Sequence, residues 1–236
     1  YQYDADFNGF RIYPLDIGQV SLQSGQAYFT RVTKDVEIDV GGTTNQDQKR
    51  LPLKSVGWHA IGNPFPIDVN ISDLKIIKTT NPTTSFSFNE AVTDNLIEPT
   101  LYFWKTEPGT GDHYSSNDQQ LKPWYGYWIR TLKANLNLII PAPSTIVNYT
   151  ASPPDNFITS MMGAAPTKTQ TPEILTQGFE LKFSLVSDTS ADITTRLGTH
   201  QEARVGWDQM DQSEPPRLKH IASAYFDHLD WVDTSH

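Results

Sequence analysis

The chain has 236 residues, of which 37% are hydrophobic and 11% aromatic, and its net charge is −9 from 27 acidic and 18 basic residues. This acidic balance argues against nucleic acid and anionic membranes as partners, because phosphate binding needs clustered Lys and Arg. The lack of Cys excludes disulfides, thiolate metal sites and cysteine nucleophiles. Six Trp argue against a disordered chain, and 16 Pro with 14 Gly favour many short strands joined by turns.

Alternation of apolar and polar residues predicts strands along much of the chain. In chain order, the expected strands cover residues 26–40, 74–79, 84–88, 125–129, 135–140 and 179–186. Helical periodicity is nearly absent, and the short helix candidates are 93–97 and 73–77, the second of which fits a strand equally well. In the last strand every second residue is apolar, which predicts one buried face with Glu180 and Lys182 pointing outward. We therefore expect an all-β fold with β-sandwich-like domains.

Two stretches of the chain look like copies of one unit. Residues 1–42 and 101–142 both run from an aromatic strand through a Gly-containing turn to a second aromatic residue. Both continue to an aromatic pair, Tyr28-Phe29 or Tyr127-Trp128, with an Arg two residues later and then an apolar strand. The second copy is preceded by a Gly-Trp motif that the first copy lacks. We therefore expect an incomplete repeat at the N-terminus and a chain that starts in mid-unit, as a fragment of a longer protein.

The repeat and a connector rich in Pro, Ser and Thr set the expected domain limits. Residues 1–150 are predicted to form a β-rich domain that contains a partial unit at 1–42 and a related unit at 51–142. Residues 151–177 are expected to form a linker, and residues 178–236 a second β domain.

The sharpest local motif is Gly-Trp-His-Ala-Ile-Gly-Asn-Pro-Phe-Pro at 57–66. Trp58 and Ile61 are expected to be buried anchors on a strand, followed by a turn and a stiff, extended exit. A functional interpretation would make Trp58 and Phe65 a platform on which a sugar stacks. Core packing is the stronger hypothesis, because buried aromatic side chains dominate core energetics.

The highest aromatic density of the chain lies at 124–128. Alternation places Tyr125 and Tyr127 on one face of a strand, and Trp124 and Trp128 on the other. One face is expected in the core, and the other could form an exposed aromatic strip that binds sugar or protein. Core or interface packing is again favoured over a sugar site.

Acidic and histidine residues indicate no active site. The segment 206–214 carries spaced acidic residues but lacks the central Gly and terminal Glu of a calcium loop, so a solvated loop is expected. His228 lies between Asp227 and Asp230, yet no placed nucleophile accompanies it. The six His are scattered, and phosphate-loop, dinucleotide and zinc-helix motifs are missing. We expect no catalytic residue, no metal and no cofactor.

Four motifs follow one another along residues 51–231: the Gly-Trp motif at 57–66, Leu-Lys-Pro-Trp-Tyr-Gly-Tyr-Trp, Gly-Trp-Asp with a later Pro-Pro, and Tyr-Phe-x-His-x-Asp-Trp. This order resembles a module of large secreted bacterial surface proteins that often carry sorting or immunoglobulin-like domains. The sequence departs from that pattern at His59 and Ala60, where Asn and Leu are usual. The resemblance implies an architecture of strands and turns, and it brings no catalytic motif.

The expected function is therefore a non-catalytic structural or interaction segment of a larger extracellular or cell-surface bacterial protein, or an accessory subunit of an extracellular assembly. Its expected partners are other protein domains or subunits of a surface assembly, with polysaccharide as a further candidate and without nucleic acid or membrane insertion. One alternative is a carbohydrate-binding or adhesin module that uses the aromatic strip. The other is a fragment of a secreted hydrolase.

Overall fold

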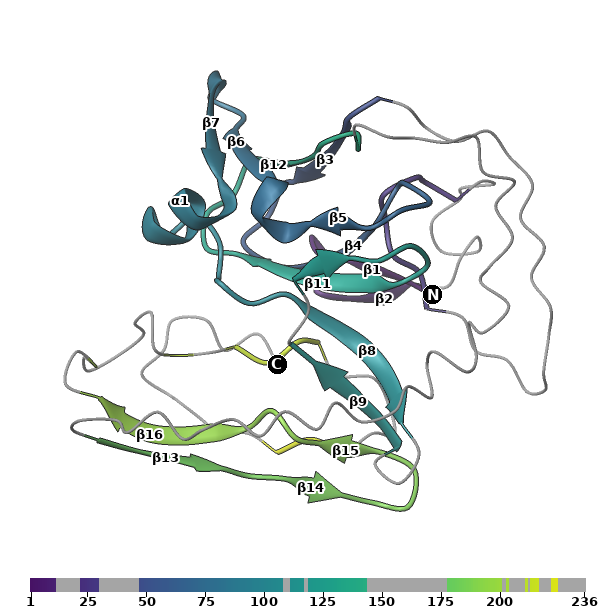
Figure 1. Ribbon diagram of the computed structural model, residues 1–236, viewed down its shortest axis with the longest axis vertical. Helices are drawn as coiled ribbons and strands as arrows, with labels where there is room; N and C mark the ends of the chain where they lie inside the picture. The colour runs from purple at the N-terminus through teal and green to yellow at the C-terminus, as the bar shows by residue number, and fades with distance from the viewer. Residues whose placement is uncertain are drawn as a thin grey trace. The chain divides into compact units, whose positions relative to one another are not determined.

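The computed structural model describes residues 1–11, 22–29, 47–107, 111–116, 119–143, 178–200, 203, 211, 213–216 and 222–224. The chain divides into two compact units, Tyr1–Phe103 with Ser116–Asp155, and Trp104–Ser115 with Asn156–His236. The described part folds into several antiparallel sheets with little helix, which confirms the predicted all-β fold (Figure 1).

Two four-stranded sheets hold most strands of the first unit (Figure 1). One sheet has the order β3-β12-β6-β7, made from Lys49–Leu53, Leu136–Ile140, Lys75–Lys78 and Asn81–Ser87. The other has the order β4-β11-β8-β9, made from Gly57–Gly62, Gly126–Thr131, Tyr102–Glu107 and Gly111–Ser115. The division between the units falls inside β8, after Phe103, so β9 belongs to the second unit.

Side chains from both sheets share one hydrophobic core in the first unit. Leu53 on β3, Ile76 on β6 and Leu138 on β12 meet Ile61 on β4 and Ile129 on β11 in this core. Two sheets that pack across a common apolar layer form the arrangement of a β-sandwich. Removal of this layer from water supplies the main free energy that stabilises the unit.

The shorter elements of the first unit are β1 (Gln2–Asp4), β2 (Gly9–Arg11), β5 (Val69–Asn70), β10 (Gln120–Leu121) and the 3-10 helix η1 (Ile71–Asp73). β1 pairs with β2 in a hairpin, and β5 pairs with β10. η1 ends at Asp73 and β6 begins at Lys75, so most of the stretch at 73–77 is strand and not α-helix.

The helix predicted at 93–97 is wrong, because the helix α1 spans Phe88–Thr93. Ser87 starts it with a capping box: its Oγ accepts a hydrogen bond from the Glu90 N–H, and the Glu90 carboxylate accepts one from the Ser87 N–H. The bond from the Ser87 backbone, with that from its hydroxyl, lowers the pKa of Glu90. Asn95, with φ of 51°, ends the helix in a left-handed conformation.

The second unit contains two small described sheets. β13 (Gly178–Lys182) pairs with β16 (Arg196–His200), and β14 (Leu185–Val186) pairs with β15 (Ala191–Asp192). The strand predicted at 179–186 is thus divided in two. Its expected half-burial is also wrong, because every described side chain of β13 is exposed on both faces.

Several sequence predictions fall wholly or partly outside the described residues. They concern the linker at 151–177, most of the calcium-loop candidate at 206–214, the final strand that carries His228, and much of the first repeat copy at 1–42. The repeat of residues 1–42 in residues 101–142 therefore stays a prediction. Within the described residues, no helix has the length and apolar content that a membrane crossing requires.

Candidate functional site

Trp128 lies in an aromatic cluster and is only 1% exposed. Its ring meets the ring of Tyr3 edge-on at 4.8 Å and that of Phe10 at 6.0 Å, and it stacks on Phe29 at 5.9 Å. Because Tyr3 and Phe10 come from the β1-β2 hairpin, the N-terminal residues cover the outer face of β11. The inner face of β11 already lies in the core. Trp128 therefore does not belong to an exposed aromatic strip.

The two tyrosines of this motif face the core. Tyr127 is buried, and its hydroxyl accepts a hydrogen bond from the Lys122 N–H at 2.8 Å and donates one to the Gln120 carbonyl at 3.1 Å. Tyr125 is half-buried, and its ring meets that of Phe103 edge-on at 6.1 Å. These side chains pack β11 and hold the turn that precedes it.

The Gly-Trp motif also builds the fold. Trp58 is buried with its ring 5.8 Å from that of Tyr102, and Ile61 is buried as predicted. Phe65 is buried too, so it provides no stacking platform. Asn63 accepts a hydrogen bond from the Phe65 N–H and donates from its amide to two backbone carbonyls, which fixes the turn after β4.

Trp124 differs from the other predicted surface residues because 41% of it is exposed. It lies in a turn in which the Tyr125 N–H approaches the Lys122 carbonyl at 3.5 Å, and its φ is 68°. A left-handed backbone normally costs a bulky residue about 1–2 kcal/mol. Trp124 thus combines an exposed aromatic surface with an unfavourable backbone position.

A buried ion pair lies at the other end of β11. The Arg130 guanidinium contacts the Glu98 carboxylate at 2.6 Å, and both side chains are almost fully buried. The Glu98 N–H also donates to the Arg130 carbonyl at 3.0 Å, so the loop after α1 continues the pairing beside β11. This geometry indicates a structural role for the pair.

His59 is another buried polar residue of the first unit. Its Nε2 lies 3.0 Å from the Ser55 carbonyl oxygen and 3.3 Å from Thr131 Oγ1. Burial lowers the pKa of His59, and this effect exceeds the opposing effects of the Ser55 carbonyl and the Asp6 charge. His59 is therefore neutral near pH 7.

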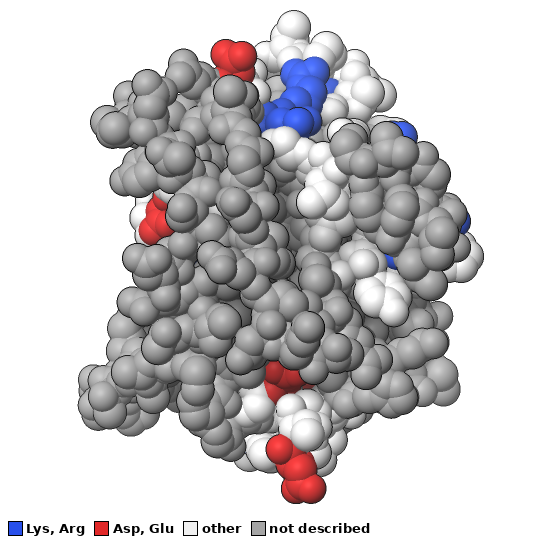
Figure 2. Space-filling model, turned by 90° about the vertical axis from the view of Figure 1, so that its right-hand side faces the viewer, with Lys and Arg blue, Asp and Glu red and all other residues white. Residues whose placement is uncertain are grey.

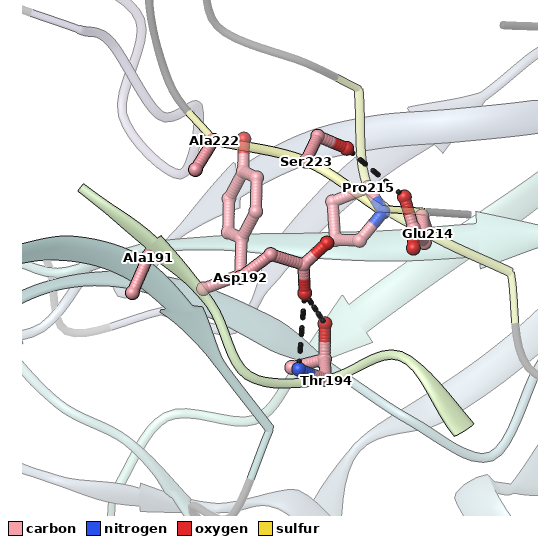
Figure 3. Close-up of a pocket in the computed structure, with 8 residues that line it drawn as sticks. Ala191, Asp192, Thr194, Glu214, Pro215, Ala222 and Ser223 are labelled. Carbon is pink, nitrogen blue, oxygen red and sulfur yellow. Dashed lines mark hydrogen bonds between the residues drawn. The ribbon is translucent and has the colours of Figure 1, made fainter. Parts of the chain in front are cut away.

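The second unit contains an acidic pocket (Figure 3). Its lining residues are Tyr114, Ala191, Asp192, Thr194, Glu214, Pro215, Ala222 and Ser223. Asp192 is buried, and its two carboxylate oxygens accept hydrogen bonds from the Thr194 N–H at 3.1 Å and the Ala224 N–H at 2.7 Å. The Thr195 hydroxyl lies 3.2 Å from an oxygen of Asp192 and 3.2 Å from an oxygen of Glu214.

This pocket has two carboxylates in proximity, but they are already engaged. Asp192 ties the turn after β15 to the backbone at Ala224, and the Glu214 carboxylate is within 3.4 Å of the Ser223 hydroxyl. In the described part of the chain, no group of three or more His, Cys, Asp or Glu is arranged to hold a metal ion. These contacts indicate that the two carboxylates hold three loop segments together.

This acidic pocket is not predicted by the sequence. Asp192 followed by Thr194 and Thr195 is a turn signal, because an Asp side chain often accepts hydrogen bonds from residues two positions later. Nothing in the sequence spacing indicates Glu214 as their neighbour, since the contact joins residues that are far apart in the chain.

On the face drawn in Figure 2, some of the described Lys and Arg side chains form a small group near the top, and the described Asp and Glu side chains lie in separate places. Comparisons with protein-family models, curated proteins and solved structures found no match for this chain.

Proposed function

We propose that this chain is a non-catalytic structural or interaction segment of a larger extracellular or cell-surface bacterial protein, or an accessory subunit of an extracellular assembly. Its partners are then other protein domains or subunits of that assembly. Its role then lies in its shape and its contacts with neighbours, without a cofactor.

The observation that carries the proposal is the burial of the aromatic motifs. Trp58, Tyr127 and Trp128 fill the core or the covered outer face of β11. Side chains in these positions stabilise the sheets and are not available to a ligand. The most distinctive residues of the sequence thus support a structural role.

The hydrolase alternative would rely on Asp192 and Glu214, since glycosidases use a pair of carboxyl groups about 5–10 Å apart. The hydrogen bonds to Asp192 from the backbone and from Thr195 favour a structural task for this carboxylate. We therefore give preference to the non-catalytic proposal.

One observation favours a second candidate, a carbohydrate-binding or adhesin module. Trp124 is exposed and is held in a backbone conformation that rarely suits a bulky residue. Strained residues of this kind cluster at functional sites, and an exposed indole ring can stack on a sugar. A single Trp is a smaller platform than the predicted aromatic strip.

The test is a polysaccharide-binding and hydrolysis screen with the full chain. We expect no specific glycan binding and no release of reducing sugar. Binding that is lost in Trp124→Ala and retained in Trp124→Phe would replace the proposal with the carbohydrate-binding alternative. Sugar release that is lost in Glu214→Gln, with the fold intact by circular dichroism, would replace it with the hydrolase.

A further inference from the structure

The sheet of β13 and β16 has an apolar face whose side chains are exposed. Phe179, Leu181 and Phe183 alternate along the chain, and Leu197 lies directly opposite Leu181. Each of these four side chains is between 40% and 50% exposed. Sheets normally bury their apolar face against another layer, so this face has the character of an interaction surface.

The other face of the same sheet is charged. The Glu180 carboxylate lies 3.6 Å from the Lys182 ammonium and 3.5 Å from the Arg196 guanidinium, and all three side chains are well exposed. β13 is therefore amphipathic, with apolar side chains on one face and both signs of charge on the other.

The outer edge of β13 is oriented to receive another strand. The Phe183 N–H donates to the Thr195 carbonyl at 2.9 Å, so the odd-numbered residues direct their backbone groups toward β16. Glu180 and Lys182 then direct their N–H and C=O groups away from β16. Among the described residues, β13 pairs with β16 alone. Such an edge is a template for strand addition.

The sequence of this edge is complementary to itself. Phe179-Glu180-Leu181-Lys182-Phe183 reads apolar, acidic, apolar, basic, apolar. When two copies run antiparallel with Leu181 opposite Leu181, each Glu180 faces a Lys182 and each Phe179 faces a Phe183. Opposite charges in directly facing positions stabilise a strand pair, and like charges destabilise it.

We propose that a second copy of this chain adds to β13, antiparallel and about a two-fold axis at Leu181. The backbone groups of Glu180 and Lys182 pair across the axis, and a four-strand sheet results with the order β16-β13-β13-β16. Its apolar faces join into one continuous surface, and its charged faces join on the opposite side. The contact is isologous, as expected for a two-fold dimer.

The charges of Glu180 and Lys182 determine the register in which two β13 strands pair, and they favour a second copy of the chain as the partner. A shift that centres the pair on Glu180 places Glu opposite Glu, and one that centres it on Lys182 places Lys opposite Lys. A shift by one residue sets apolar side chains against charged ones. A strand from an unrelated protein would not require the internal symmetry of residues 179–183, whereas a second copy does. This inference names a second copy of the chain as one partner of the interaction segment proposed above, and it rests on that proposed function.

The test is sedimentation velocity of the full chain over a wide range of concentration. The wild-type chain should pass from monomer to dimer as concentration rises, because strands of this length bury a small interface. Lys182→Glu should weaken the dimer about tenfold or more, since it creates two Glu–Glu contacts across the axis. Lys75→Glu, which changes the net charge equally at an exposed position on β6, should dimerise like the wild type.

Charge exchange provides the decisive control. The double variant Glu180→Lys with Lys182→Glu keeps the pattern self-complementary and should dimerise again. The single variants Glu180→Lys and Lys182→Glu should each dimerise about tenfold or more weakly than the wild type when alone, and should form a heterodimer when mixed. Circular dichroism of each variant establishes that the fold is retained.

A wild-type chain that stays monomeric at all concentrations would overturn the proposal, and so would a dimer that Lys182→Glu leaves unchanged. Either result would leave the glycan and hydrolysis screen unaffected. A failure of the self-association is therefore distinguishable from a failure of the proposed function.

Discussion

The two tryptophans of the 124–128 motif lie in different environments, although residues four positions apart in a strand lie on the same face. Trp128 is surrounded by rings from the N-terminal residues, and Trp124 is exposed in a turn before β11 begins. Simple alternation predicted that they share a face. It fails because the strand starts only at Gly126, and the left-handed backbone of Trp124 breaks the period of two.

The buried His59 should make stability depend on pH. Its pKa in the folded chain lies below the ordinary value of 6.5 that the unfolded chain retains, because burial disfavours the charged ring. Between these two values the unfolded chain binds more protons, so stability falls as pH falls through that window. At pH values above the pKa that His59 has in the unfolded chain, the stabilisation due to the neutral, buried ring is fully present.

His59→Gln tests this linkage. As the pH is lowered from about 7 to about 5, the free energy of unfolding of the wild type should fall more steeply than that of the variant, measured by denaturant titration. Parallel pH profiles for the two proteins would contradict a neutral, buried His59.

Among the secondary-structure elements, the presence of a strand is easier to predict from the sequence than its first and last residues. The sequence alternation in 135–140 and 74–79 corresponds closely to β12 and β6, because each has one face in the core. The helix was misplaced although Ser87 and Glu90 have the spacing of a capping box. The burial of β11 on both faces was not predictable, since it depends on a hairpin more than 100 residues earlier in the chain.

The ion pair between Glu98 and Arg130 should stabilise the attachment of the 96–98 loop to β11. Glu98→Gln should lower the free energy of unfolding by about 3–5 kcal/mol, because it removes one charge of a buried ion pair. The double variant Glu98→Leu with Arg130→Met should recover most of this loss, since it buries no charge. Denaturant unfolding followed by tryptophan fluorescence measures both, and a loss below about 1 kcal/mol in Glu98→Gln would contradict the buried pair.

At the scale of the molecule, the all-β class follows from composition and alternation, while the acidic pocket and the apolar face of β13 emerge only from the fold. The pocket joins Asp192, Glu214 and Ala224 through long-range contacts that sequence spacing does not reveal. The alternation in β13 was visible, but it predicted a buried face where the structure has an exposed one. The exposed apolar face supports the proposed pairing between two copies.

We propose that the buried aromatic residues of the two motifs build the fold. Denaturant unfolding of Trp128→Ala and Trp124→Ala in the full chain tests this role. Trp128→Ala should lose about 3–5 kcal/mol of stability, because it empties a packed aromatic cluster. Trp124→Ala should change stability by less than about 1 kcal/mol, because Trp124 is 41% exposed and lies in a turn outside the core. A Trp128→Ala variant that unfolds at the wild-type denaturant concentration would contradict the claim.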